Sequence, residues 1–90
     1  MSATLIVRHT VADYSSWLVA YKDAATVRSK HGCTAEQVYR LPADGNDVLV
    51  THDFPTVAQA EAFVADPDLR AAMGRGGVSS EPRIEIFERA

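Results

Sequence analysis

The sequence lacks several features that mark particular classes of protein. It has one cysteine, Cys33, which excludes an internal disulfide and is typical of a protein in a reducing compartment. Its 9 basic residues are outnumbered by 12 acidic ones and are interspersed with them, so no cationic surface for nucleic acid is predicted. No apolar run approaches the roughly 20 residues of a membrane-spanning helix, and residues 1–4 show no signal-peptide pattern. We therefore expect a cytoplasmic protein with neither nucleic-acid nor membrane partners.

What the sequence does contain is the composition of one small folded domain. Hydrophobic residues make up 47% of the chain, charged residues make up 23%, and the formal net charge is -3. These are ordinary values for a globular protein, and a chain of 90 residues is long enough for a single core. A single domain over residues 1–90 is predicted.

Hydrophobic periodicity and turn residues predict four strands and three helices. Asp13 has the position of a helix N-cap and Gly32 that of a helix stop, so one long helix is expected between them. Thr56 to Gln59 has the spacing of a capping box, and Asp66-Pro67 starts a further helix. The strands are expected at Thr4–His9, Thr34–Leu41, Asp47–Phe54 and Pro82–Arg89, with a hairpin loop at Pro42–Asn46.

This order predicts an α+β, ferredoxin-like βαββαβ fold with a four-stranded antiparallel sheet. The first and third strands are central, and the second crossover is split into two helices. The helices cover one face of the sheet only. Because the other face would expose apolar side chains, we expect a homodimer in which two sheets pack face to face through the open face.

Three segments resemble a known group of proteins. They are Val11-Ala12-Asp13-Tyr14-Ser15-Ser16-Trp17, Asp66-Pro67-Asp68-Leu69-Arg70-Ala71-Ala72-Met73, and Gly77-Val78 shortly before Pro82. The chain resembles the dimeric α+β barrel superfamily, which includes the antibiotic-biosynthesis monooxygenases, and within it a subgroup of small, uncharacterised proteins. The resemblance implies a dimeric α/β barrel that encloses a small-molecule pocket. It also implies activity as a cofactor-independent, monooxygenase-like enzyme on an aromatic or polyketide-like ligand. Oxidative members use Asn, Trp and His in the cavity, and that set has no matching motif positions here.

His9 is the candidate catalytic residue. It shares strand parity with Leu5 and Val7 and comes just before the turn into Asp13. If that parity faces the barrel, a residue that titrates near neutrality would line an apolar cavity, as a general base does. The alternative is a histidine that only caps the end of a strand.

Further pocket candidates come from the first helix and from two strands. Tyr14, Trp17 and Tyr21 share one helical face with Arg28, and this face either lines the pocket or only packs on the sheet. Arg28 either reaches the edge of the core or, as we favour, snorkels to solvent near the helix end. The complete set of predicted pocket residues is Tyr14, Trp17, Tyr21, Arg40 and His52.

Other kinds of chemistry lack the residue patterns that they require. His9, His31 and His52 lack metal-ligand spacing, so no metal site is predicted, and haem would be a cofactor only if a histidine faced the pocket. Cys33 has no base near it in sequence. The glycines of residues 74–77 follow a helix, whereas a phosphate loop precedes one.

The sequence is compatible with an enzyme and with one alternative. The alternative is a non-catalytic dimer that binds a small apolar ligand or has a packed barrel interior. A void of roughly 300 Å³ lined by a histidine and aromatic residues would favour a ligand site. An interior filled by Leu5, Val7, Val50 and Ile86 would favour the alternative.

Overall fold

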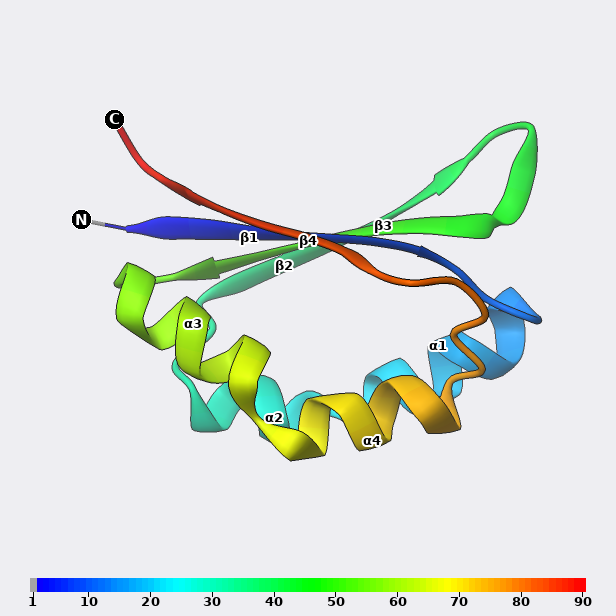
Figure 1. The fold of residues 1–90 in the computed structure, drawn as a ribbon, viewed down its shortest axis with the longest axis horizontal. Helices are drawn as coiled ribbons and strands as arrows, with labels where there is room; N and C mark the ends of the chain where they lie inside the picture. The colour runs from blue at the N-terminus through cyan, green and yellow to red at the C-terminus, as the bar shows by residue number, and fades with distance from the viewer. Residues whose placement is uncertain (1) are drawn as a thin grey trace.

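The computed structural model describes residues 2–90 and consists of a four-stranded sheet with helices packed on one of its faces (Figure 1). No helix within this range is long and apolar enough to cross a membrane. The elements are β1 (Ala3–Thr10), α1 (Tyr14–Asp23), α2 (Ala25–Lys30), β2 (Ala35–Leu41), β3 (Asp44–Phe54), α3 (Val57–Ala65), α4 (Pro67–Arg75) and β4 (Arg83–Glu88).

The sheet has the predicted ferredoxin-like arrangement. Its strand order is β2-β3-β1-β4, every neighbouring pair is antiparallel, and β1 and β3 are central. The register places Leu5 opposite His52 and Val7 opposite Val50. Because side chains alternate along a strand, these four residues lie on the same face, and that face is the one the helices cover.

The predicted helix caps are present and explain where three helices begin. Asp13 accepts a hydrogen bond from the Ser16 amide at 3.0 Å and so caps α1. Thr56 accepts one from the Gln59 amide at 3.2 Å at the start of α3. Asp66 caps α4, in which proline occupies the first turn.

The prediction of one long first helix was wrong in one respect, because the helix is interrupted at Ala24. This residue has φ −86° and ψ 10°, and it is both the C-cap of α1 and the N-cap of α2. The Ala24 side chain is small and buried, which lets the break lie against the rest of the fold. Because neither glycine nor proline occupies the position, no local signal in the sequence indicates a break there. Both crossovers, and not only the second, therefore contain two helices.

The glycines that follow α4 serve packing and chain reversal. The Gly76 amide donates to the Ala72 carbonyl at 2.9 Å and closes the helix. A Cβ at Gly76 would lie 2.9 Å from Cδ1 of Trp17, which is closer than carbon atoms pack. Gly77 has φ +71°, a conformation that residues with side chains rarely adopt. The segment ends a helix, as its position after α4 predicted, and it also packs on α1.

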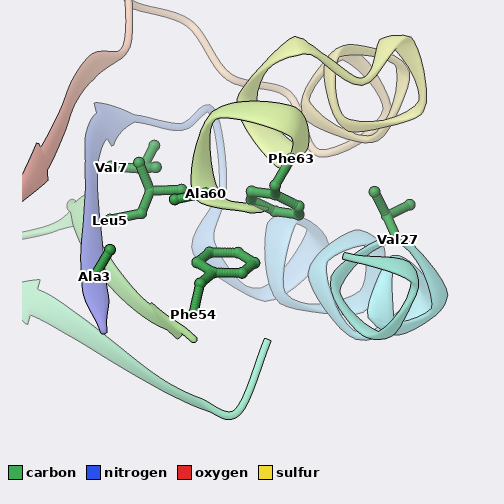
Figure 2. Close-up of a cluster of buried hydrophobic side chains, with 7 residues drawn as sticks. All are labelled: Ala3, Leu5, Val7, Val27, Phe54, Ala60 and Phe63. Atoms are coloured by element: carbon green, nitrogen blue, oxygen red, sulfur yellow. The ribbon is translucent and has the colours of Figure 1, made fainter. Parts of the chain in front are cut away.

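The main core lies between the sheet and α2 and α3. Figure 2 shows Leu5 and Val7 pointing from β1 toward Ala60 and Phe63 of α3, with Val27 of α2 on the far side. Leu5 and Ala60 are fully buried, and Phe63 is 1% exposed. A second cluster joins Val11, Trp17, Val48 and Val50 beneath α1.

The other face of the sheet carries no helix (Figure 1). Residues of the opposite strand parity lie there, with Ile6 and Leu49 half-buried on the central strands. Three large apolar side chains are exposed at the edge strands, namely Tyr39, Leu41 and Phe87. Arg8 and Asp47 form an ion pair at 2.9 Å at one end of this face. The open face is therefore mixed, with apolar residues beside paired charges.

Candidate functional site

The candidate site is a cavity of about 50 Å³ between the sheet and the helices of a single chain. Its sheet side is formed by Val7, His9, Val50 and His52, and its helical side includes Trp17, Tyr21, Arg28, Phe63 and Met73. Residues from both central strands and from all four helices thus meet in one place. We expected the pocket between two facing sheets, but His9 and His52 line a cavity on the helical face of a single sheet instead.

Strand parity explains the difference. His9 would line a barrel only if the face that it shares with Leu5 and Val7 were the barrel face. In the structure this parity faces the helices, and Leu5 and Val7 are buried there. Leu5, Val7, Val50 and Ile86 therefore cannot fill a space between two sheets. A continuous apolar run on a strand shows that both faces are apolar but does not show which one the helices cover.

An unbroken row of aromatic rings connects the two histidines through α1. The His9 imidazole meets the Trp17 indole edge-on, with centroids 5.9 Å apart and planes at 86°. Trp17 stacks on Tyr21 at 5.0 Å, and Tyr21 lies 6.5 Å from His52. His52 also faces Phe63 of α3 at 5.2 Å. His9 and His52 stand four residues apart in the sheet register, or about 13 Å at ~3.3 Å per residue, and both line the cavity.

Several buried polar atoms that lie at this cavity have no hydrogen-bond partner among residues 2–90. They are both ring nitrogens of His9, Nδ1 of His52 and the hydroxyl of Tyr21. Both histidines are only 5% exposed. Each buried polar atom without a partner costs about 1–3 kcal/mol, so a well-packed structural core rarely contains several together. Their convergence is typical of a site that binds water or a polar ligand.

Burial keeps both imidazoles neutral at physiological pH. It lowers the pKa of His9, an effect that the charge of Asp47 partly opposes. Burial, aided by the positive charge of Arg28, lowers the pKa of His52 to about 4. A neutral imidazole has one nitrogen that accepts a proton, so each histidine is in the form required of a base.

Tyr21, in contrast to the two histidines, offers a proton donor. Burial raises the pKa of its phenol, so the hydroxyl stays protonated and can donate a hydrogen bond into the cavity. The nearby carboxylate of Glu36 acts in the same direction, although the two groups do not meet hydrogen-bonding geometry. The site therefore combines acceptors on two histidines with a donor on Tyr21.

Arg28 is part of the site, and the snorkelling interpretation was wrong. It is 7% exposed and lines the cavity from α2. Its Nη1 donates to the Tyr21 carbonyl oxygen at 2.8 Å, and its Nε forms an ion pair with Glu36 of β2. The sequence signal was present, because Arg28 falls on the apolar stripe of its helix.

Two of the predicted pocket residues lie outside the cavity. The Arg40 guanidinium is 3.8 Å above the Tyr14 ring, and its Nε donates to the Gly45 carbonyl at 2.9 Å. The cation–π contact and the hairpin hold both side chains at one end of the sheet. Neither Tyr14 nor Arg40 lines the cavity, whereas Trp17, Tyr21 and His52 do. Phe63 and Met73, which also line it, had no signal in the sequence beyond helical periodicity.

The remaining candidate residues have contacts that indicate structural roles. His31 contacts Asp66 at 2.7 Å, and Lys30 contacts the same carboxylate at 2.9 Å, so these residues connect α2 to α4. Burial raises the pKa of the Cys33 thiol, which disfavours the nucleophilic thiolate. Residues 2–90 hold no group of three or more histidine, cysteine or acidic side chains arranged for a metal ion.

The cavity does not fit haem. A pocket for even a drug-sized ligand holds about 300–1,000 Å³, and this cavity has about 50 Å³. Both histidines that face it are packed on aromatic rings of α1 or α3. No step that involves haem is supported by these residues.

Comparison with known proteins identifies the fold. No protein-family model matches the chain, and no curated protein matches it in sequence. Among solved structures, SnoaB from Streptomyces nogalater, a cofactor-independent oxygenase, has a TM-score of 0.81 at 13% identity over 99% of this chain and 93% of SnoaB. A candidate antibiotic biosynthesis monooxygenase from Bordetella bronchiseptica has a TM-score of 0.82 at 13% identity, covering 99% of this chain and 97% of that one. A similar protein from Caulobacter crescentus has a TM-score of 0.78 at 15% identity, covering 99% and 90%. The predicted fold of the antibiotic-biosynthesis-monooxygenase-like proteins is confirmed.

Proposed function

We propose that this protein binds a small aromatic or polyketide-like ligand in the cavity between its sheet and helices, and oxidises it without a bound cofactor. The observation that carries the proposal is the set of buried polar atoms without partners on His9, Tyr21 and His52. The fold shared with SnoaB, a cofactor-independent oxygenase, supports the type of reaction. Because the shared identity is 13%, the activity is proposed from the site itself.

The chemistry requires a base and an electron-rich substrate. A neutral imidazole accepts a proton from an activated CH₂ group of the ligand, and the electron pair of that C–H bond stays on the ligand. The resulting anion reduces O₂. One oxygen atom becomes the carbonyl oxygen of the product and the other leaves as water, so the CH₂ group becomes C=O and no external reductant is consumed. His9 and His52 are the candidate bases.

The size of the cavity sets a condition on this proposal. A ring the size of benzene occupies a cavity of about 150 Å³, so an aromatic ligand must widen the space seen here. Leu69 and Met73 of α4 border the cavity and are only partly buried. Met side chains are flexible and adapt to irregular volumes, so α4 is the wall we expect to yield.

The small volume also favours a second candidate function. In it, the cavity holds only water and the protein is a non-catalytic, structural dimer with a closed interior. The two candidates differ in whether an aromatic ligand reaches Trp17. Trp17 is the only tryptophan of the chain and lines the cavity, so its fluorescence reports directly on occupancy.

The test uses anthrone, whose CH₂ group would become the second carbonyl of anthraquinone. We expect saturable quenching of Trp17 fluorescence and consumption of one O₂ per anthraquinone formed. His9→Phe and His52→Phe keep ring volume but remove the base, and the variant of the true base should lose most of the turnover. His31→Gln is the matched control, because His31 contacts Asp66 outside the cavity. Turnover that survives in the double variant His9→Phe/His52→Phe would reject the histidines as bases, and an absence of both quenching and turnover would reject the enzyme.

We further propose that the open face of the sheet binds a second copy of this chain. Ile6 and Leu49 lie at its centre, and Tyr39 and Phe87 are 52% and 54% exposed. An exposed face of this kind is typical of a protein interface. A two-fold axis would bring the same face of each copy together. Sedimentation of the wild type at micromolar concentration should give twice the chain mass, and Tyr39→Glu/Phe87→Glu should give the monomer. Val19→Glu, on the exposed side of α1, is the control that should leave the mass unchanged.

A further inference from the structure

Arg28 is a charged side chain placed where a charge is costly. It lies on α2 with 7% exposure and lines a cavity formed largely by apolar and aromatic residues. Moving a cation from water into such a place costs several kcal/mol unless it is paired and hydrogen-bonded. A helix position two residues from the end of α2 could hold the same side chain in solvent, so its burial calls for a physical reason.

The contacts of Arg28 fix its orientation but leave donors available. Nη1 donates to the Tyr21 carbonyl at 2.8 Å, Nε faces the Glu36 carboxylate, and the guanidinium carbon lies 4.0 Å above the centre of the Tyr21 ring. A guanidinium has five N–H groups, and the two polar contacts use two of them. The guanidinium is therefore held at one wall of the cavity, over the Tyr21 ring.

The charge of Arg28 acts on the cavity more strongly than its partner does. The Glu36 side chain is 39% exposed on an edge strand, so water screens it, while the Arg28 side chain is 8% exposed. The positive charge helps to lower the pKa of His52, and it opposes the rise in the pKa of the Tyr21 phenol that burial causes and Glu36 promotes. Among residues 2–90, Arg28 is the one charged side chain that lines the cavity, and Glu36 does not line it.

We propose that Arg28 determines the ligand class of this cavity by selecting a planar ligand that has an ionisable enol or phenol oxygen, and by stabilising the oxyanion. This inference rests on the proposed function. When Nδ1 of His52 accepts the proton, an N–H bond forms, the C–H or O–H bond of the ligand breaks, and the electron pair remains on the ligand with the negative charge on its oxygen. A second cation beside Arg28 is unfavourable unless an anion appears with it. The site therefore accepts a proton only from a ligand whose oxygen then lies against Arg28.

The test compares 2-naphthol with its methyl ether, which has the same ring system and no acidic proton. Binding is followed by quenching of Trp17 fluorescence, and ionisation of bound naphthol by the absorbance of the naphtholate. We expect the wild type to bind naphthol at least about tenfold more tightly than the ether. We also expect the pKa of bound naphthol to fall by about one unit, because one pKa unit corresponds to a tenfold change in the equilibrium constant. Arg28→Gln should lose both effects and still bind the ether, and Arg28→Lys should keep part of them. Glu36→Gln is the matched control and should keep both effects, because it leaves the cation in place.

The outcomes separate the two proposals. If the wild type binds both compounds equally and bound naphthol ionises as it does in water, the role of Arg28 is overturned while ligand binding stands. If the wild type binds neither naphthol, its ether nor anthrone, the proposed function fails and this inference fails with it. The measurement on the wild type alone is decisive even where Arg28→Gln does not fold.

Discussion

The imidazole of His9 meets the indole of Trp17 edge-on, with ring centroids 5.9 Å apart and planes at 86°. This contact gives the only tryptophan of the chain a titratable neighbour inside the fold. It ties the end of β1 to the middle of α1 and makes the protonation of one residue visible in the emission of the other.

Trp17 fluorescence should therefore titrate with His9. A protonated imidazole quenches an indole in contact with it more strongly than a neutral one does. Because burial lowers the pKa of His9, the midpoint should lie below 6.5, the ordinary value for histidine. His9→Phe should abolish the transition and His31→Gln should preserve it, with circular dichroism over the same range showing that the fold persists. A transition at pH 6.5 or above would contradict the buried, neutral state of His9.

His52 should make the protein sensitive to acid. The unfolded chain binds a proton at His52 near pH 6.5 and the folded chain only near pH 4, so the unfolded state holds more protons between these values and stability falls as the pH is lowered through them. Between pH 7 and pH 5 the wild type should lose about 2 kcal/mol of unfolding free energy through this group, at 1.36 kcal/mol per unit. Urea unfolding at the two pH values measures the loss, and His52→Phe should reduce it by that amount. An equal loss in both proteins would show that His52 is protonated in the folded state.

Leu5 should be among the most sensitive positions of the core. It is fully buried between the sheet and α3, so Leu5→Ala removes apolar contacts and leaves a void (Figure 2). The expected loss is about 2–5 kcal/mol of unfolding free energy. Val19 is 62% exposed on α1, and Val19→Ala should change stability by less than about 0.5 kcal/mol. Equal effects of the two substitutions would mean that the packing described for β1 is wrong.

The carboxylate of Asp66 should act both as a helix cap and as an ion-pair partner. It accepts the Asp68 amide at 2.9 Å and contacts Lys30 and His31 of α2. Asp66→Asn keeps a capping group and loses the charge, while Asp66→Ala loses both, so the melting temperature should fall by several degrees in the first and further in the second. The bonds from His31 and Lys30 hold the pKa of Asp66 well below its usual range, so the advantage of the wild type over Asp66→Asn should be full at pH 7 and shrink in strong acid. Thermal melts at pH 7 and pH 3 test both parts.

The sequence predicted the fold because its signals are local. Capping residues at Asp13, Thr56 and Asp66 define where helices start through bonds to amides only a few residues away. The alternating and continuous apolar runs define the strands. The break at Ala24 is a tertiary effect, since no residue there has a strong preference for ending a helix.

The site was harder to predict because it depends on which side of the sheet the helices cover. Strand parity grouped His9 with Leu5 and Val7 but left the two faces equivalent. The position of the buried Arg28 likewise depended on a partner from β2, which only the folded chain brings near. Arg40 and Tyr14 were assigned to the pocket from their elements, and their mutual contact takes both away from it.

The two faces of the sheet are encoded at alternating positions of the same strands. His9 and Val50 face the cavity, while their neighbours Arg8 and Leu49 lie on the open face. Substitutions that change ligand preference and substitutions that change assembly therefore fall at different residue positions. A library restricted to the odd positions of β1 and the even positions of β3 could change ligand preference while the opposite surface stays as it is. A scaffold of 90 residues built in this way allows its two surfaces to evolve independently.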